Sequence, residues 1–184
     1  MKMKYAVRSA QEADVLHAAI ISETISLANQ DADNGICKRS ASFLQQKILE
    51  GDAIIAVTKQ NKWVGFIYLQ KWSDDYVSCC ALIVHPRYRN EKIAGQLKQK
   101  AVDLAKRKYP NARLFGLTTA AAVMKINSRL GYQPVTYDQI TSDQNFWNAC
   151  QTCPNYEILK EKGQRNCLCT AMLLEKGEVQ EEVV

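Results

Sequence analysis

Residues 79–97 read CCALIVHPRYRNEKIAGQL, and this stretch decides the fold. It contains the short apolar run of residues 81–84, which has the length and composition of a buried strand. Pro86 ends the run because proline has no N–H to give to a neighbouring strand, and a helical pattern begins at Ile93. A strand that passes into a helix through a tight turn leaves unpaired N–H groups at the positive end of the helix dipole. The stretch therefore predicts a binding site for an anion, most simply a pyrophosphate.

The composition of the whole chain is that of one globular domain. Its 184 residues are 47% hydrophobic and 23% charged, and the net charge is +5. No apolar run approaches the roughly 18 residues that span a bilayer, and the N-terminal segment lacks the apolar core of a signal peptide. We therefore expect a cytoplasmic protein without membrane contact. Basic residues are spread along the chain without interleaved aromatic residues, which disfavours nucleic acid as a partner and suits a small anionic ligand.

Periodicity and turn residues predict alternating strands and helices from residue 3 to residue 137. A helix capped by Ser9, with Glu12 completing a capping box, is expected to run to about residue 27, and Ser40 is expected to cap a second helix. The other expected elements are strands at 3–8, 52–58, 63–72, 76–84, 112–119 and 132–137, and helices at 41–49, 94–108 and 120–130. The helix at 94–108 crosses over the sheet, which makes the strands on either side of it parallel. The predicted fold class is α/β, an α+β arrangement with a mixed sheet.

The same pattern predicts how the chain is divided. We expect a catalytic domain over residues 1–140, a cysteine-containing extension over residues 141–174 that packs on it, and an acidic flexible tail over residues 175–184. No repeat and no Pro/Gly/Ser-rich linker interrupts the chain.

The element order and the loop resemble the GNAT superfamily of N-acetyltransferases, which bind acetyl-CoA at such a turn. The family's loop has Arg or Gln, two residues, Gly, one residue, and then Gly or Ala. Arg89 and Ala94 match its ends, whereas Lys92 stands in the glycine position, so either Lys92 takes a left-handed conformation or the turn is reshaped around Gly95. The resemblance covers residues 3–137 and implies that acyl-CoA binds to two sets of residues. They are Leu82, Ile83 and Val84 on the strand, and Arg89, Asn90, Glu91, Lys92, Ile93, Ala94 and Gly95 on the loop.

Four segments, in order, resemble the acetyltransferase domain of N-acetylglutamate synthases: residues 38–40 (KRS), 85–89 (HPRYR), 114–119 (LFGLTT) and 131–135 (GYQPV). This likeness implies an acyltransferase for the α-amine of a small amino acid, with glutamate in arginine biosynthesis as the best guess. The donor is expected to be acetyl-CoA, with succinyl-CoA or another acyl-CoA as alternatives. Lys38 and Arg39 can hold the acceptor's carboxylate before a helix, or form an ordinary surface charge pair. Thr118 and Thr119 can line the acceptor cavity, although strand propensity explains them almost as well.

The residues that would move protons depart from the family's pattern. By this resemblance, Ser78 aligns with the glutamate that often acts as base, and Asn127 stands at the position of the tyrosine that donates the proton to the leaving thiolate. Ser128 and Tyr132 are the alternatives to Asn127 as the acid. Glu23, Asp74, Asp75 and Ser78 through a water are the candidates for the base. We expect direct attack by the amine without an acyl-enzyme, because no Cys or Ser stands beside a base in a recognisable motif. The departures keep a second class of function open, a non-catalytic module that senses CoA esters or docks a partner. Dimers are common in the family, so a homodimer is also expected.

The seven cysteines cannot all pair within the chain, because their number is odd. Cys79 and Cys80 fall in an apolar strand, where cysteine acts as a small core residue. Cys150, Cys153, Cys167 and Cys169 have the inventory of a structural zinc site, although a single residue separates the second pair. Buried free thiols or a redox pair are the alternatives.

Overall fold

The computed structural model describes residues 4–30 and 35–176, so most of the predicted acidic tail over residues 175–184 lies outside the described residues. The described strands are β1 Tyr5–Ser9, β2 Ala53–Thr58, β3 Trp63–Lys71, β4 Tyr76–Val84, β5 Arg113–Thr118, β6 Gln133–Val135 and β7 Thr170–Leu174. The α-helices are α1 Ala18–Asn29, α2 Ala41–Leu49, α3 Ile93–Lys108, α4 Ala121–Arg129, α5 Gln144–Ala149 and α6 Tyr156–Glu161. Short 3-10 helices include η1 Glu12–His17, η3 Pro86–Tyr88, η4 Tyr137–Gln139 and η5 Cys150–Thr152.

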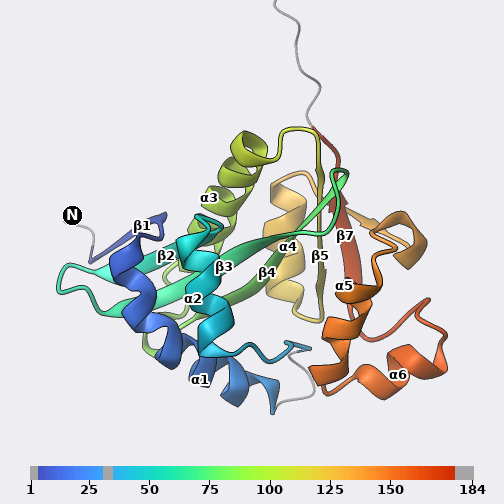
Figure 1. Ribbon diagram of the computed structural model, residues 1–184, viewed down its shortest axis with the longest axis horizontal. Coiled ribbons are helices and arrows are strands. Elements are labelled where there is room, and N and C mark those ends of the chain that lie inside the picture. Colours follow the sequence, from blue (N-terminus) through green and yellow to red (C-terminus); the bar gives the residue numbers. More distant parts are fainter. Residues whose placement is uncertain (1–3, 31–34, 177–184) are drawn as a thin grey trace, which may run out of the picture.

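The strands form one mixed sheet in the order β1-β2-β3-β4-β5-β7-β6 (Figure 1). The predicted antiparallel meander of β2, β3 and β4 and the parallel pairing of β4 with β5 are confirmed. Strand β7 has no counterpart among the predicted elements, yet it lies inside the sheet between β5 and β6. Its sequence, TAMLL, is a short apolar run that periodicity does not distinguish from a piece of helix. The C-terminal part of the chain therefore completes the sheet.

Helices cover both faces of the sheet (Figure 1). On one face, α1 and α2 pack on β2 and β3 through Ile21, Ile25 and Leu44, all fully buried. On the other face, α3 contributes the predicted buried stripe, in which Leu97 and Ala101 have no exposed surface. A third apolar cluster joins β5 and β7 to α5 and α6 at the C-terminal end of the chain. Burial on both faces explains the nearly continuous apolar sequences of β2 and β3.

The first helical segment begins later than predicted. Ser9 is the last residue of β1, and the helical turn starts after Gln11. The carboxylate of Asp14 accepts a hydrogen bond from the Gln11 N–H at 2.7 Å. It also forms an ion pair with the guanidinium of Arg8 at 2.6 Å. Asp14 thus takes the capping role predicted for Glu12, because the cation on β1 compensates its buried charge. The cap predicted at Ser40 is confirmed, with its hydroxyl accepting from the Phe43 N–H at 3.2 Å.

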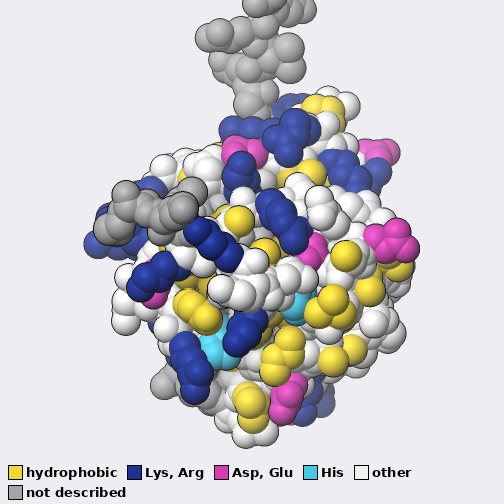
Figure 2. Space-filling view, turned by 90° about the vertical axis from the view of Figure 1, so that its left-hand side faces the viewer, with side chains coloured by type: hydrophobic (Ala, Val, Ile, Leu, Met, Phe, Trp, Pro, Cys, Tyr) yellow, Lys and Arg dark blue, Asp and Glu magenta, His cyan; other side chains and the backbone are white. Residues whose placement is uncertain are grey.

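Helix α3 is anchored at its C-terminal end to the start of β2. Lys108 Nζ lies 2.6 Å from the Asp52 carboxylate, and the Tyr109 hydroxyl donates to the same oxygen at 2.8 Å. None of the helices in the described ranges combines the length and apolarity needed to cross a bilayer. On the face beside β1, Lys and Arg side chains are dispersed among polar and apolar ones (Figure 2).

Strands β4 and β5 separate along their length. They pair only where Tyr76, Val77 and Ser78 face residues 113–115, although β4 continues to Val84. The register between β3 and β4 also shifts between Phe66 and Tyr68, and Ala81 has a φ of 53°. This bulge bends β4 at the point where it has lost its partner β5. The backbone of β4 after Ser78 is therefore available to another molecule on that side.

Candidate active site

The turn between β4 and α3 is held in one shape by local contacts. The Arg87 N–H donates to His85 Nδ1 at 3.2 Å. The Tyr5 hydroxyl donates to the Glu91 carbonyl at 2.9 Å and accepts from Gln96 Nε2 at 3.2 Å, which ties the turn to β1. The first N–H groups of α3 have no carbonyl partner within the helix, and they lie at its positive end. The turn therefore has the geometry of an anion site.

Lys92 resolves the alternative left by the sequence. Its φ of 61° and ψ of 16° are left-handed, and it immediately precedes Ile93, the first residue of α3. Gly95 lies inside the helix, and a Cβ added to it would meet no heavy atom within 4 Å. The turn is therefore not reshaped around Gly95. A left-handed lysine is strained by about 1–2 kcal/mol, and the contacts of Tyr5 with the turn help to hold it.

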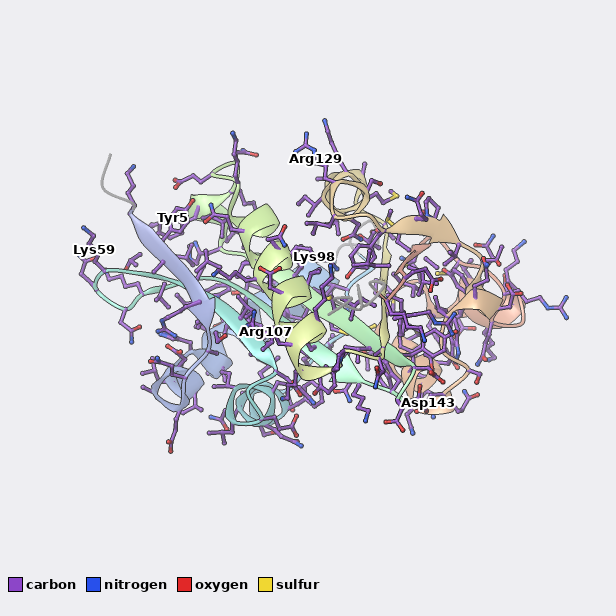
Figure 3. The ribbon with its side chains drawn as sticks, turned by 90° about the horizontal axis from the view of Figure 1, so that it is seen from above. Tyr5, Lys59, Lys98, Arg107, Arg129 and Asp143 are labelled. Carbon is purple, nitrogen blue, oxygen red and sulfur yellow. The ribbon has the colours of Figure 1, made fainter. Side chains whose placement is uncertain are left out.

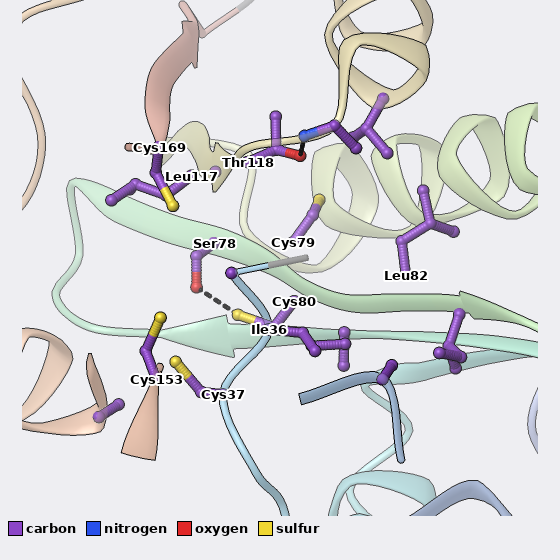
Figure 4. Close-up of a pocket in the computed structure, with 18 of the residues that line it drawn as sticks. Ile36, Cys37, Ser78, Cys79, Cys80, Leu82, Leu117, Thr118, Cys153 and Cys169 are labelled. Atoms are coloured by element: carbon purple, nitrogen blue, oxygen red, sulfur yellow. Dashed lines mark hydrogen bonds between the residues drawn. The ribbon is translucent and has the colours of Figure 1, made fainter. Parts of the chain in front are cut away.

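A cavity of about 470 Å³ lies where β4 and β5 separate. Figure 4 shows Ser78, Cys79, Cys80 and Leu82 on β4 across its middle, with β5 on one side and Cys37 and Cys153 on the other. Of the residues predicted for the site, the cavity is lined by Arg39, Ser78, Leu82, Ile83, Val84, Arg89, Ala94, Thr118, Asn127, Cys150, Cys153, Cys167 and Cys169. One cavity thus joins the end of the predicted anion loop to the predicted acceptor residues.

Arg39 also lines the cavity. Its Nε donates to the Tyr68 hydroxyl at 2.6 Å, and its Nη1 donates to the Lys38 carbonyl at 2.7 Å. The Arg39 carbonyl accepts from the Ser22 hydroxyl at 2.7 Å. Among the described residues no carboxylate lies within ion-pair distance of its guanidinium. Arg39 is thus an oriented cation whose Nη2 makes no hydrogen bond with the described residues.

Charge is retained at Arg39 despite its burial. Burial by itself lowers the pKa of the guanidinium, but the neighbouring Tyr68 and Cys80 more than compensate and leave the pKa above its ordinary value. The guanidinium also lines a second cavity of about 390 Å³, in which Lys38 lies beside it. Lys38 itself is exposed, and its N–H donates to Thr152 Oγ1 at 3.1 Å. The two predicted acceptor-binding cations therefore differ, one enclosed and the other at the surface.

Two of the three predicted catalytic residues reach the cavity. Ser78 is 1% exposed, and its hydroxyl accepts from Trp72 Nε1 at 2.7 Å and lies 3.0 Å from Cys80 Sγ. Asn127 is 1% exposed, and its Oδ1 has no hydrogen-bond partner among the described residues. Glu23 is exposed on α1 and does not line the cavity. Among the described residues that line the cavity, none is Asp, Glu or His.

The two predicted threonines lie in different surroundings. Thr118 lines the cavity, and its Oγ1 accepts from the Ala120 N–H at 3.1 Å, next to the start of α4. Thr119 does not line the cavity and lies against Gly35, where an added Cβ would come within 2.9 Å of its Cγ2. Of the two threonines, Thr118 is therefore the one that lines the cavity.

The four cysteines predicted to bind zinc do not form one group. The thiols of Cys150 and Cys153 contact that of Cys37, which is not one of the four predicted ligands. The Cys167 thiol instead lies 2.8 Å from the Tyr137 hydroxyl and accepts from the Cys169 N–H at 3.3 Å. The described part of the chain contains no group of three or more Cys, His, Asp or Glu positioned to hold a metal ion. The predicted zinc site is therefore not formed in the described residues, because other partners engage its thiols.

Several cavity residues were not among the predicted site residues, including Trp72, Cys37 and Lys98. The sequence could have indicated that Lys98 points inward, because it comes four residues after Ala94 and three before Ala101 on a helix with one buried face. A lysine in that register stands on the inward side. Trp72 and Cys37 had no such signal, since distant parts of the chain bring them to the cavity.

Comparison with known proteins identifies relatives of this architecture. The model of the acetyltransferase (GNAT) family matches residues 22–126. Rv2747 from Mycobacterium tuberculosis in complex with CoA and NLQ has a similar structure, with a TM-score of 0.65, 16% identity, and coverage of 92% of this chain and 98% of that one. N-acetylglutamate synthase from Neisseria gonorrhoeae complexed with coenzyme A and N-acetyl-glutamate has a TM-score of 0.66 at 19% identity, over 97% of this chain and 36% of that one.

The ribosomal-protein-S18-alanine N-acetyltransferase from Escherichia coli has a TM-score of 0.59 at 16% identity, over 98% of this chain and 99% of that one. No curated protein sequence matches the chain. At these identities the similar structures establish a common fold, and they include proteins with different acceptors.

Proposed function

The chain belongs to the acetyltransferase (GNAT) family and is an N-acetyltransferase, and on this premise we propose that it acetylates the α-amine of a small acidic amino acid, with acetyl-CoA as donor. Glutamate is the best single candidate for the acceptor. The observation that carries the proposal is the charge of the cavity. Arg39, Arg89 and Lys98 line it, and no acidic residue does so in the described part of the chain. Such a lining favours two anionic ligands side by side.

For the donor, the turn and the separated strands supply complementary halves of a site. The pyrophosphate of acetyl-CoA would take hydrogen bonds from the first N–H groups of α3, with Arg89 adding charge. The pantetheine arm would follow β4 from Val84 towards the bulge at Ala81, in the place of a partner strand. A backbone N–H at the bulge would then polarise the thioester carbonyl.

For the acceptor, Arg39 supplies the recognition. A carboxylate in the cavity can take the N–H groups that Tyr68 and Lys38 leave unused, in a charge-assisted contact that a neutral amino acid does not make. The Thr118 hydroxyl lies in the same cavity and can add a polar contact. The synthase complexed with N-acetyl-glutamate shares the fold, which makes glutamate the first acceptor to test.

The reaction would proceed by direct attack. The acceptor's ammonium would lose a proton to water, because the cavity has no lining Asp, Glu or His among the described residues. Ser78, which lines the cavity, would orient such a water. The amine's lone pair then forms the C–N bond with the thioester carbon. As the intermediate collapses, the nitrogen gives its second proton to water, the C–S bond breaks, and its electron pair passes to sulfur.

Release of CoA measures this function directly. Acetyl-CoA and succinyl-CoA would each be tested with glutamate, aspartate, glutamine, neutral amino acids and an alanine-terminated peptide. We expect acetyl-CoA with glutamate or aspartate to give the highest kcat/KM, and glutamine, which matches glutamate in size, to be much poorer. Preference for the peptide or for a neutral amino acid would refute the acidic acceptor. Tight CoA binding without turnover of any acceptor would favour a module that senses CoA esters.

A further inference from the structure

Lys98 is buried in the cavity without a counter-charge. It lies on the side of α3 that faces α4 (Figure 3), is 3% exposed, and lines the cavity. No carboxylate of the described residues lies within ion-pair distance of its ammonium. The Lys98 ammonium makes a cation–π contact with the ring of Tyr132, whose centroid lies 4.6 Å from Nζ. Lysine is almost never so buried unless it is paired, so this position calls for an anion that comes with a ligand.

A second buried polar group without a partner lies in the same part of the cavity. Asn127 on α4 lines it, and the Asn127 Oδ1 has no hydrogen-bond partner among the described residues. Two such groups, one cationic and one a hydrogen-bond acceptor, are costly to bury without partners. A ligand that brings both a negative atom and an N–H donor would satisfy them together.

The position of Lys98 along the cavity indicates which part of the ligand it meets. It follows the first turn of α3, and six residues of helix place it about 9 Å beyond Lys92. The Tyr132 hydroxyl, beneath it, lies 3.6 Å from Cys79 Sγ, and Cys79 comes just before the bulge at Ala81. Tyr132 thus links Lys98 to Cys79, beside the bulge where the proposed donor site would hold the thiol end of the pantetheine arm.

We propose that Lys98 contacts the sulfur of CoA and acts as the acid of the reaction. This inference rests on the proposed function. When the C–S bond breaks and its electron pair passes to sulfur, the Lys98 ammonium donates a proton to form the CoA thiol, and the resulting amine regains a proton from water. Asn127 lines the same cavity from α4, but its carboxamide has no acidic proton to give. Lys98 would fill that gap from the opposite helix.

The other groups that face Lys98 do not compete for this role. Burial raises the pKa of Tyr132, so its phenol keeps its proton. The Cys79 thiol contacts the hydroxyl of that phenol at 3.6 Å, and Arg89 belongs to the turn before α3. Lys98 is therefore the cavity cation that lies over the Tyr132 ring and can donate a proton there.

The test compares CoA with desulfo-CoA, which lacks the sulfur, by calorimetric titration between pH 6 and 10. Wild type, K98M and K98R would be measured with both compounds. If the Lys98 ammonium contacts the thiolate, binding to wild type lowers the pKa of the CoA thiol. The affinity of wild type for CoA, relative to its affinity for desulfo-CoA, should then rise with pH as the thiol ionises. The rise is about tenfold for each unit by which binding lowers the thiol pKa. K98R should keep this rise and K98M should lose it, while desulfo-CoA binds all three proteins equally, which shows that the cavity is intact.

Steady-state kinetics with the acceptor distinguish the contact of Lys98 with the CoA sulfur from its donation of a proton. K98M should lower kcat with little change in the KM for acetyl-CoA, and K98R, which keeps the charge but hardly gives up a proton, should restore CoA binding but not kcat. An equal pH dependence of CoA affinity in wild type and K98M would overturn the proposal. Failure of wild type to bind either compound would instead overturn the donor half of the proposed function.

Discussion

Removing the guanidinium of Arg39 tests the acceptor site most directly. Its Nε and Nη1 are engaged by Tyr68 and by the Lys38 carbonyl at 2.6 and 2.7 Å, so the side chain is already oriented before a ligand arrives. Nη2 makes no hydrogen bond with the described residues, and the guanidinium lines the cavity. An acceptor carboxylate would bind there without having to reorganise the protein.

The size of the effect follows from the type of contact. A hydrogen bond to a charged group contributes about 1.5–3 kcal/mol, which corresponds to roughly 10- to 150-fold in kcat/KM for each bond to the carboxylate. We therefore expect Arg39→Ala to raise the KM for the acidic acceptor by at least about tenfold, while the KM for acetyl-CoA changes by less than about twofold. Arg39→Lys keeps the charge but not the planar fork, so its effect should be intermediate.

The assay is the initial rate of CoA release at varied acceptor and fixed acetyl-CoA, with thermal unfolding recorded for each variant. Unfolding matters because the buried Tyr68 hydroxyl loses its donor in Arg39→Ala. Arg107→Ala is the matched control, since this exposed residue on α3 lies outside both cavities and its loss changes the net charge equally. An unchanged acceptor KM in a folded Arg39→Ala protein would refute the role of Arg39. An equal loss in Arg107→Ala would attribute the effect to net charge.

Three further predictions concern the loop and the thiols. Ala94→Glu should weaken CoA binding at least about 100-fold in calorimetry through bulk and like charge at the start of α3, and CoA binding close to that of wild type would contradict the loop site. Lys92→Gly should change the free energy of unfolding by less than about 1 kcal/mol, whereas Lys92→Val should lower it by more than that, because a β-branched residue is poorly accommodated at the φ of 61°. The Cys169 thiol and the Tyr137 hydroxyl hold the pKa of Cys167 below its usual value despite burial, and the pKa of Cys169 is raised, so iodoacetamide at pH 7 should label Cys167 first. Equal labelling of the two in peptide mass spectra would show that they do not share a proton in this way.

Local patterns decided the regular elements. The end of α2 at Leu49, its cap at Ser40 and the meander of β2, β3 and β4 follow from neighbours in the chain, such as Pro86 after β4 and apolar runs of strand length. The cap at the first helix was wrong because a long-range partner, Arg8 on β1, makes Asp14 the better acceptor. A helix start depends on which carboxylate is neutralised, and that is a tertiary property.

The sequence by itself determined the strand, turn and helix start that form the proposed donor site. The passage from a buried strand through a polar turn into an amphipathic helix is written in consecutive residues, and the orphan N–H groups of a helix start follow from backbone geometry whatever surrounds them. The sequence left two alternatives for the turn, a left-handed Lys92 or a shape built around Gly95. It could not choose the left-handed Lys92, because a strained backbone conformation persists only where contacts from distant parts of the chain hold it.

Only the tertiary structure decided what shares the cavity. It brought Arg39, Ser78 and Asn127 together from the chain before β2, from β4 and from α4, and it left Glu23 on the surface. It also placed β7 inside the sheet. It brought the thiols of Cys150 and Cys153 into contact with Cys37, and the thiol of Cys167 into contact with the Tyr137 hydroxyl. The physical reason is that periodicity records which face of an element is buried, whereas the partners across that face depend on how the elements pack.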